Sequence, residues 1–499
     1  MSFGEFLLVA VLALPALGAV AAAASPGDRT GRLVGTAAAA LTLLATLPLV
    51  GGEHGWVGPQ SGVQPWHQLD LPWVPGLDLR FHLGVDGISW PLVVLTALLT
   101  LLCCGYTLWR VPAGGGSGRT LVALLLVVEV GILGTFLALD LVLFFLFFEV
   151  VLLPMYAIIA GWGGADRRRA ARKFVLYTLF GSVLLLVGVY VVVAAAGTAD
   201  LVALTGGSRL SRGTQLAAFT LLALAFAVKS PLWPLHSWLP DAHTQAPTVG
   251  SVILAGVLLK MGTYGLIRVA VGVAPEGARW AAPVLGVLAV AAILIGSLVC
   301  LAQDELKRLI AYSSVGHMGF VLLGVATLTA TGLQAALIGN IAHGVITGLL
   351  FFLAGAIKDR THTGSLVDLS GLRETAPRLA GLLGFAAVAS LGLPGLAGFW
   401  GEAFAVIAAV RRGGGLWTTL GVLAALGGAL TAAYFLRLLR RVSHGRPSPA
   451  VGPLAPGLAG AELTAWAPLV LLALAVGLAP ALVLSYASGP VNALLGVLP

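Results

Sequence analysis

Residues Phe226–Gly265, FAVKSPLWPLHSWLPDAHTQAPTVGSVILAGVLLKMGTYG, hold two lysines in an otherwise apolar setting. Lys229 and Lys260 lie on either side of a connector that is rich in proline, tryptophan and histidine. A charge near the centre of a lipid bilayer is costly, so a membrane chain that keeps two ammonium groups either uses them or pairs them. This stretch therefore predicts either a functional site or a set of buried ion pairs.

The composition predicts an all-α polytopic membrane protein. Of the 499 residues, 59% are hydrophobic and only 10% are charged, whereas soluble proteins have about 25% charged residues. No soluble core of this length buries so much apolar surface. The net charge of +8 fits loops beside a membrane better than a nucleic-acid face, so we expect no nucleic-acid partner. Three cysteines (Cys103, Cys104, Cys300) lie in apolar runs and show no disulfide or metal-site spacing.

Apolar runs long enough to cross about 30 Å of hydrocarbon predict about fourteen transmembrane helices. They cover residues 3–24, 32–50, 84–109, 119–139, 141–162, 172–196, 214–237, 248–271, 280–301, 308–329, 332–356, 379–409, 416–440 and 463–487. The first run resembles a signal peptide, but Glu5 occupies the place of the basic region that such peptides need, so we interpret it as a helix of the protein. The junction near Asp140 is the least clearly marked.

The loops between these runs predict the orientation, because cytoplasmic loops carry an excess of Lys and Arg. Nineteen basic residues fall on one side: Arg29, Arg32, Arg110, Arg119, Arg167, Arg168, Arg169, Arg172, Lys173, Lys307, Arg308, Lys358, Arg360, Arg373, Arg378, Arg437, Arg440, Arg441 and Arg446. Seven fall on the other: Arg80, Arg209, Arg212, Arg268, Arg279, Arg411 and Arg412. We therefore expect both termini outside the cytoplasm. The longest outer loop, 51–83, suggests a small extracytoplasmic feature that includes a hairpin.

Two of the predicted helices contain breaks. The seventh has Pro231 and Pro234 just after Lys229, and the twelfth has the sequence LPGLAGFWGE (Leu393–Glu402), in which Pro394 precedes a charge. Interrupted segments at corresponding positions are typical of inverted repeats. The predicted domains are an N-terminal unit (1–110), a first repeat of helices four to eight (119–271), a second repeat of helices nine to thirteen (280–440) and a last helix (463–487).

Seven ionisable residues are predicted at membrane depth: Glu149, Lys229, Lys260, His317, His343, Glu402 and Glu129, the last as a second candidate partner for the pair described next. Lys229 and Glu149 would form an adjustable pair in which separation favours proton release. Pro231 cannot donate to the Ala227 carbonyl, and a freed carbonyl can hold water near Lys229. Lys260 would accept the proton, the two histidines would relay it, and Glu402 would be the last group toward the outside.

Structural interpretations of the same residues remain open. The Lys229–Glu149 pair could join two helices, and a single histidine within the membrane often forms only an interhelical hydrogen bond. Trp233 and Trp238 are typical of interfacial anchors. The spacing of His236, Asp241 and His243 is not that of a metal site, so we expect these residues to hold the connector in place. The number of buried ionisable groups favours proton transfer over a purely structural role.

Five segments resemble one known family: LDLVLFFLFFEVVLLPMY, the stretch quoted at the start, LKRLIAYSSVGHMGF, AHGVITGLLFFLAG and LPGLAGFWGE. They look like the antiporter-like subunits of proton-pumping NADH:quinone oxidoreductase, respiratory complex I, over roughly residues 80 to 440. This resemblance implies fourteen core helices, inverted repeats and discontinuous helices seven and twelve. It also implies that Glu149 and Lys229 are the input pair, Lys260 the central residue, His317 and His343 the connecting axis and Glu402 the output group.

Within the family the chain looks most like the M type, which has a glutamate in helix twelve where the L and N types have lysine; the sequence also stops after helix fourteen, without the lateral helix of the L type. The resemblance implies a bacterial plasma-membrane protein that moves protons beside L- and N-type and small membrane subunits. NADH, FMN, iron–sulfur clusters and quinone are expected in other subunits, with no cofactor or metal in this chain. The alternatives are an Mrp-type cation/proton antiporter subunit, a membrane subunit of an energy-converting hydrogenase, and a structural scaffold. Neighbouring genes would separate the complex I, Mrp and hydrogenase assignments.

Overall fold

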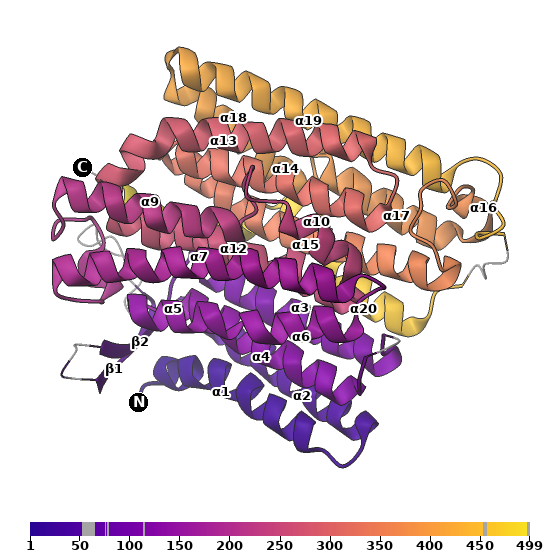
Figure 1. The fold of residues 1–499 in the computed structure, drawn as a ribbon, viewed down its shortest axis with the longest axis horizontal. Coiled ribbons are helices and arrows are strands. Elements are labelled where there is room, and N and C mark those ends of the chain that lie inside the picture. The colour runs from indigo at the N-terminus through magenta and orange to yellow at the C-terminus, as the bar shows by residue number, and fades with distance from the viewer. Residues whose placement is uncertain (52–64, 75, 77–78, 113–114, 453–456, 497–499) are drawn as a thin grey trace.

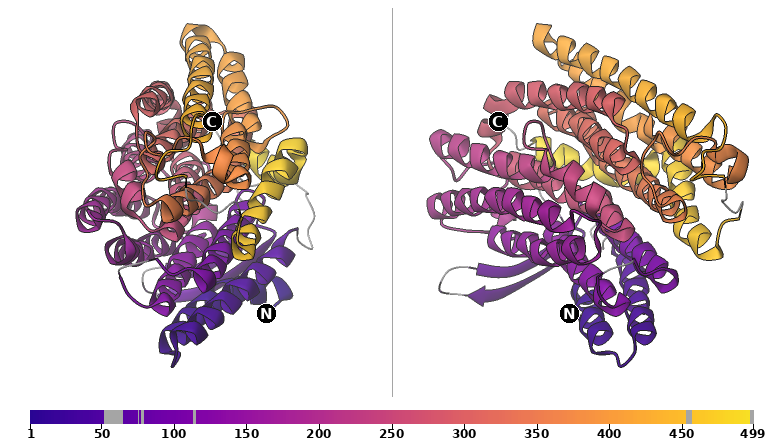
Figure 2. Two further views of the ribbon diagram at one scale, coloured as in Figure 1. Left: turned by 90° about the vertical axis from the view of Figure 1, so that its right-hand side faces the viewer. Right: turned by 45° about the vertical axis from the view of Figure 1, so that its right-hand side comes forward.

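A computed structural model describes residues 1–51, 65–74, 76, 79–112, 115–452 and 457–496 of the chain. Long helices lie side by side and run between two ends of the molecule (Figure 1). One end carries the β-hairpin, and the opposite end carries the short helix α16. We call them the hairpin end and the α16 end. Figure 2 shows that the first helices and α19 lie at opposite margins, with the middle of the chain between them.

The first half of the chain forms a two-stranded antiparallel hairpin and a set of helices. In chain order these are α1 (Phe3–Ala24), α2 (Asp28–Thr46), the 3₁₀ turn η1 (Leu47–Leu49), β1 (His67–Val74), β2 (Leu79–Val85), α3 (Trp90–Trp109), α4 (Gly118–Leu137), α5 (Leu141–Val150), α6 (Leu152–Trp162), α7 (Arg167–Ala196), α8 (Leu201–Leu204), α9 (Arg212–Lys229) and α10 (Trp238–Gln245). In the hairpin His67 pairs with Val85, and the register shifts between Pro72 and Val74. The predicted hairpin is thus present; residues 52–64, 75 and 77–78 of that loop lie outside the described residues.

Helices are the regular elements of the second half in its described residues. Its elements are α11 (Thr248–Ile253), the π-helical turn η3 (Leu254–Leu258), α12 (Leu259–Gly265), the π-helical turn η4 (Leu266–Val271), α13 (Pro275–Ala302), α14 (Leu306–Ala326), α15 (Ala330–Thr361), α16 (Leu372–Thr375), α17 (Pro377–Ser390), α18 (Ala397–Arg412), α19 (Gly414–Ser443), α20 (Gly460–Leu478) and α21 (Ala481–Gly496).

Twelve helices of the described chain are long and apolar enough to cross a membrane. The two predicted spans outside this set, 214–237 and 379–409, are the two that contain proline breaks. The first consists of α9 and α10 with residues 230–237 between them, and the second of α17 and α18 with residues 391–396 between them. The discontinuous helices are therefore confirmed.

Two predicted boundaries were wrong. The span predicted from residue 84 begins at Trp90, because β2 extends to Val85 and the turn after it contains Asp86. The last predicted helix, 463–487, is divided at Ala479 and Pro480 into α20 and α21, because proline cannot continue the backbone hydrogen bonds of a helix. The predicted helix start at residue 141 is confirmed: α5 begins at Leu141, and the Asp140 carboxylate caps it by accepting from the N–H groups of Val142 and Leu143.

Two short backbone bridges support the predicted repeat. Asp140 pairs with Asp200 and Glu305 pairs with Ser365, both in antiparallel geometry. The partners are 60 positions apart in each bridge, and the second bridge follows the first by 165 positions. The broken helices also point in opposite senses: α9 precedes α10 from the hairpin end, whereas α17 precedes α18 from the α16 end (Figure 1). Opposite directions of equivalent elements are what an inverted repeat requires.

The eighth predicted span, which comprises α11, η3, α12 and η4, and the helix α15 form the buried centre of the molecule. The span Thr248–Val271 is fully buried and contains both π-helical turns, η3 before Lys260 and η4 after it. α15, which is 32 residues long, is also almost entirely buried. In a π turn the N–H group bonds five residues back, so one carbonyl is offset from the regular helix, and such turns are frequent at functional sites. The two helices that carry Lys260 and His343 are thus shielded on all sides by protein.

Prediction: Gly401→Ala lowers the thermal stability of the protein. Gly401 lets α18 approach α15, and a Cβ at this position would lie 2.6 Å from the Cα of Gly339. Because the neighbour is backbone, the helices must separate, at a cost of about 1–3 kcal/mol. Thermal unfolding of the purified protein, followed by tryptophan fluorescence, measures the effect.

Gly381→Ala in α17 is the matched control, because a Cβ there meets no atom within 4 Å. Its unfolding temperature should be unchanged or slightly raised, since alanine favours a helix by roughly 1 kcal/mol over glycine. Equal unfolding temperatures for the two variants would contradict the close approach of α18 and α15.

Candidate functional site

The fully buried ammonium group of Lys260 contacts His343 directly. Lys260 Nζ lies 2.6 Å from Nδ1 of His343 and 2.5 Å from the carbonyl oxygen of Ala255. Ala255 belongs to the π-helical turn η3, which offsets its carbonyl toward the lysine. The structure therefore brings together two of the predicted residues from helices far apart in the chain.

When Lys260 is protonated, this contact determines which nitrogen of His343 holds a proton. A lysine ammonium group has only donors, so Nδ1 of His343 must accept, and a neutral ring then carries its hydrogen on Nε2. His343 Nε2 is buried and has no hydrogen-bond partner. It is therefore free to donate to a water molecule or to a neighbouring base.

His317 continues the line away from Lys260. Its ring centroid lies 5.8 Å from that of His343. His317 Nε2 lies 3.0 Å from the carbonyl oxygen of Ser390, and a carbonyl can only accept, so Nε2 carries a hydrogen. Nδ1 of His317 is buried without a partner. In the neutral ring this nitrogen is an acceptor, which complements the donor on His343.

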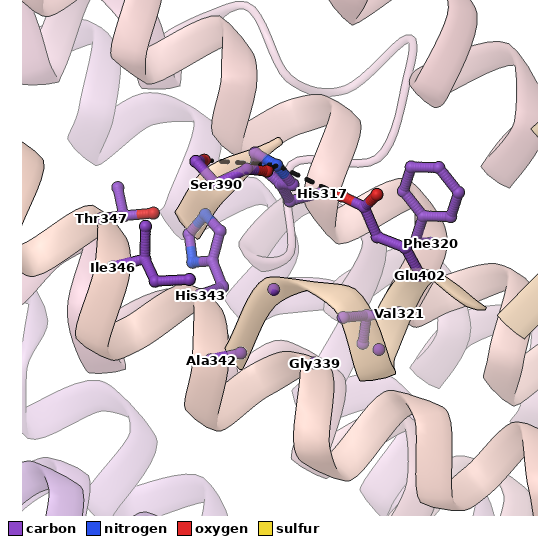
Figure 3. A pocket seen from close by; sticks show the side chains of 12 residues that line it. His317, Phe320, Val321, Gly339, Ala342, His343, Ile346, Thr347, Ser390 and Glu402 are labelled. Atoms are coloured by element: carbon purple, nitrogen blue, oxygen red, sulfur yellow. Dashed lines mark hydrogen bonds and ion pairs between the residues drawn. The ribbon is translucent and has the colours of Figure 1, made fainter. Parts of the chain in front are cut away.

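Glu402 ends this line of residues. Its Oε1 atom lies 3.4 Å from Nε2 of His317, a separation within the range of an ion pair, although Oε1 has no partner with hydrogen-bond geometry. Figure 3 shows the side chains of His317, Ser390 and Glu402 directed toward one another. The break between α17 and α18 makes room for the Glu402 carboxylate. Gly392 has φ of +78°, and a Cβ there would lie 2.9 Å from Oε2 of Glu402.

A small cavity lies beside the two histidines and Glu402. It is lined by both rings, Glu402 and Ser390, together with apolar and glycine residues of α14, α15 and α18 (Figure 3). The volume open to the centre of a water molecule is about 20 Å³, which is enough for roughly one water. One water could join His343 Nε2 to His317 Nδ1, since each nitrogen lacks a partner.

Lys229 lies apart from this group. It is buried at the last position of α9, with Nζ 4.8 Å from the ring centre of Phe148. Glu149 is close enough to interact with Lys229 electrostatically, but no ion pair within 4.0 Å joins the two among the described residues, and Oε1 of Glu149 has no hydrogen-bond partner. The structure thus holds the predicted pair in a separated arrangement, in which the aromatic face stabilises the cation.

The proposed effect of Pro231 on Ala227 was wrong. The Ala227 carbonyl is not free, because it accepts from the N–H of Leu232 at 2.9 Å, one position beyond the missing proline donor. The next carbonyl, that of Val228, accepts from Nε1 of Trp238 at 3.0 Å. Trp238 is fully buried, so the prediction that it is an interfacial anchor was also wrong. Its indole instead caps the end of α9.

Two further predictions concern acidic and basic residues outside the line. Glu129 is completely buried in α4, and both of its carboxylate oxygens lack hydrogen-bond partners, so the structure does not join it to Lys229 or Lys260.

Arg268 was counted among the basic residues of outer loops, but it is buried in η4 and forms an ion pair with Asp86. The unbroken apolar run around Arg268 was the signal for its burial.

His243 is a buried titratable group that the sequence pattern does not reveal. It is fully buried in α10, neither ring nitrogen has a hydrogen-bond partner, and its ring stacks on Phe351 with centroids 4.4 Å apart. Asp241, two residues earlier, binds Lys173 and Arg308, in agreement with the expectation that this segment is held in place. Within the described ranges, no group of three His, Cys, Asp or Glu residues could hold a metal ion.

Comparisons with known proteins agree with this architecture. Residues 138–427, more than half of the chain, match the family model described as NADH:quinone oxidoreductase/Mrp antiporter, TM. The NADH-quinone oxidoreductase subunit M of Rhodobacter capsulatus is 39% identical over 97% of this chain and 93% of the relative. The subunit of the same name from Rickettsia conorii is 39% identical over 85% of each chain.

Solved structures give the same result. A chain of respiratory complex I from Thermus thermophilus with bound NADH has a TM-score of 0.86 and 31% identity, over 99% of this chain and all of that one. A chain of the Mrp complex from Dietzia has the same TM-score and 25% identity, over the full length of both chains. The chain belongs to the family of membrane subunits that NADH:quinone oxidoreductases and Mrp antiporters share.

Proposed function

We propose that this chain is the M-type, proton-translocating membrane subunit of an NADH:quinone oxidoreductase. The observation that carries the proposal is the buried line Lys260, His343, His317 and Glu402, whose members are donor and acceptor in alternation. A role in holding helices together needs paired groups, whereas this line leaves one nitrogen of each histidine without a partner. Unpaired buried polar groups are costly, and proton transfer gives a reason to keep them.

Protons move along this line in steps, each from a donor atom to the next acceptor atom. Lys260 Nζ gives a proton to Nδ1 of His343, and His343 releases its other proton from Nε2. A water in the cavity carries it to Nδ1 of His317, which releases the hydrogen on Nε2 to Oε1 of Glu402. Each ring is then in its other tautomer, so it must reset before the next proton. The reset is a step at which a change elsewhere in a complex can control transport.

Lys229 and Glu149 control the charge state of Lys260. In the arrangement described here Lys229 faces an aromatic ring rather than a carboxylate. A free ammonium group in a low-dielectric interior repels a second cation over a long range. Contact with Glu149 would neutralise Lys229 and favour proton uptake at Lys260; separation would favour proton release toward His343. Glu129 is a further acid whose part in this control stays a proposal.

The redox chemistry belongs to other subunits in this proposal. NADH, FMN, iron–sulfur clusters and quinone bind elsewhere, and the chain works beside L- and N-type and small membrane subunits in the plasma membrane of a bacterium. The basic residues at the α16 end, including Arg110, Arg360 and Arg441, orient that end to the cytoplasm. The termini then lie outside. An Mrp-type antiporter has the same fold, but relatives of higher identity are named as subunit M.

Prediction: Lys229→Ala and Glu149→Ala allow the complex to assemble but lower proton pumping and coupled NADH oxidation by roughly tenfold or more, because each removes a group needed to set the proton affinity of Lys260. Native gels measure assembly, and a pH-sensitive dye in reconstituted vesicles measures pumping. Normal pumping by assembled variants would support the scaffold alternative instead.

Prediction: Lys260→Ala abolishes most proton pumping, while Lys260→Arg retains part of it. Arginine keeps the positive charge beside His343 but does not release a proton in proteins. The residual activity of the arginine variant therefore measures how much the charge alone contributes. Full activity in both variants would remove Lys260 from the proton path.

Prediction: Glu402→Gln lowers pumping by roughly tenfold or more, because the amide cannot take up the proton that leaves His317. Glu402→Asp should retain more activity than Glu402→Gln. Glu276→Gln is the matched control, since Glu276 is an exposed acid that pairs with Arg212. If Glu402→Gln pumps as well as the control, Glu402 is not the acceptor.

A further inference from the structure

The segment that joins α9 to α10, the two halves of the discontinuous seventh span, is held on one side by α7 of the first repeat. Lys173 of α7 donates to the Ser237 carbonyl at 2.8 Å and to Oδ2 of Asp241 at 2.7 Å. Tyr177, one turn later in α7, shares a hydrogen bond of 2.8 Å with the Ser237 hydroxyl. Three polar contacts thus attach the start of α10 to α7.

The same segment is held by the second repeat on its other side. Arg308 of α14 lies 3.2 Å from Oδ1 of Asp241. Tyr312, one turn later, packs its ring edge-on against His236, with centroids 6.0 Å apart. Lys307 donates to the carbonyl of Ala246, just after α10, at 3.0 Å. One oxygen of the Asp241 carboxylate therefore contacts the first repeat, through Lys173, and the other contacts the second repeat, through Arg308.

The two helices joined in this way lead to different parts of the proton line. α10 is attached to the Lys229 end of α9, because Trp238 donates to the Val228 carbonyl. α14 carries His317 nine residues beyond Arg308, on the far side of Lys260 from Lys229. A displacement of α10 can therefore reach both the Lys229 end of α9 and the helix that carries His317 through contacts that the structure contains.

We propose that Asp241 is a positioning residue that couples the Lys229 half of the molecule to the His317 half, and we call its contacts with Lys173 and Arg308 the Asp241 bridge. The inference rests on the proton-transfer function proposed above. The bridge keeps α10 in a fixed place relative to α7 and α14. Movement of the broken helix, driven by the charge of Lys229, is then passed to α14.

A purely stabilising role would give a different result. The side chains of Lys173, Asp241 and Arg308 are each about one-third exposed, and exposed ion pairs contribute little to stability. The chain has many larger stabilising contacts, so loss of the bridge should leave the fold and assembly intact. What it should change is the coupling between the two repeats, which such contacts can alter severalfold.

The experiment compares Asp241→Asn with Asp304→Asn in the assembled, reconstituted complex. Asp304 is a matched control, because it also lies at the α16 end and also pairs with two arginines, Arg437 and Arg441. Its partners are both in α19, so its contacts stay within the second half. Asp304→Asn should leave the ratio of protons pumped to NADH oxidised unchanged.

Asp241→Asn should assemble normally and lower that ratio by roughly threefold or more, and Asp241→Glu should restore part of it. Lys173→Met and Arg308→Met should each reproduce the defect, and combining either with Asp241→Asn should add little, because all three act through one bridge. A normal ratio in Asp241→Asn, or fully additive effects, would overturn the inference.

The outcome also separates this inference from the proposed function. If Lys229→Ala abolishes pumping while Asp241→Asn pumps normally, the proton line stands and the bridge fails. If Lys229→Ala also pumps normally, the proposed function itself is wrong. Loss of assembly in Asp241→Asn but not in Asp304→Asn would mean that the bridge is structural, which also overturns the inference.

Discussion

The contact between Lys260 and His343 is the interaction on which the arrangement of the molecule depends. A lysine that is fully buried needs acceptors, and it has two: the Ala255 carbonyl and the imidazole. The first requires the π-helical turn η3, and the second requires α15 to pass directly beside helix eight. Both helices are therefore kept away from lipid, and the other helices form the shell that shields them. The cost of burying one ammonium group thus explains why the two most buried helices lie together.

The breaks in the two discontinuous helices serve different local purposes. At the break between α9 and α10 the lost backbone hydrogen bonds are almost fully replaced. The N–H of Leu232 donates to the Ala227 carbonyl, and Nε1 of Trp238 donates to that of Val228. The break between α17 and α18 contains glycines with positive φ and leaves space for the Glu402 carboxylate beside Gly392. The first break therefore fixes the position of a cation, and the second accommodates an acid. Symmetry of the fold does not require equal chemistry at the two breaks.

Apolar patterning and proline positions predicted most of the fold, because membrane helices must satisfy their own backbone hydrogen bonds. The same information cannot show how helices pack. Arg268 was assigned to a loop, although Asp86, a residue 182 positions earlier, supplies the buried countercharge. The separation of Lys229 from Glu149 depends on where Phe148 lies. The tautomers of His317 and His343 depend on which carbonyl or ammonium group faces each ring. These are contacts between distant segments, and no local pattern encodes them.

The geometry also holds the two histidines in opposite senses. Each histidine is fixed at one nitrogen, His343 by Lys260 and His317 by the Ser390 carbonyl, and each has its other nitrogen free. A single ring fixed at one nitrogen could only accept or only donate at the other. Two rings fixed in opposite senses present a donor to an acceptor across the cavity. In the proposed proton path, a water in the cavity that both rings line would connect them, so the hydration of this cavity would be a point of control.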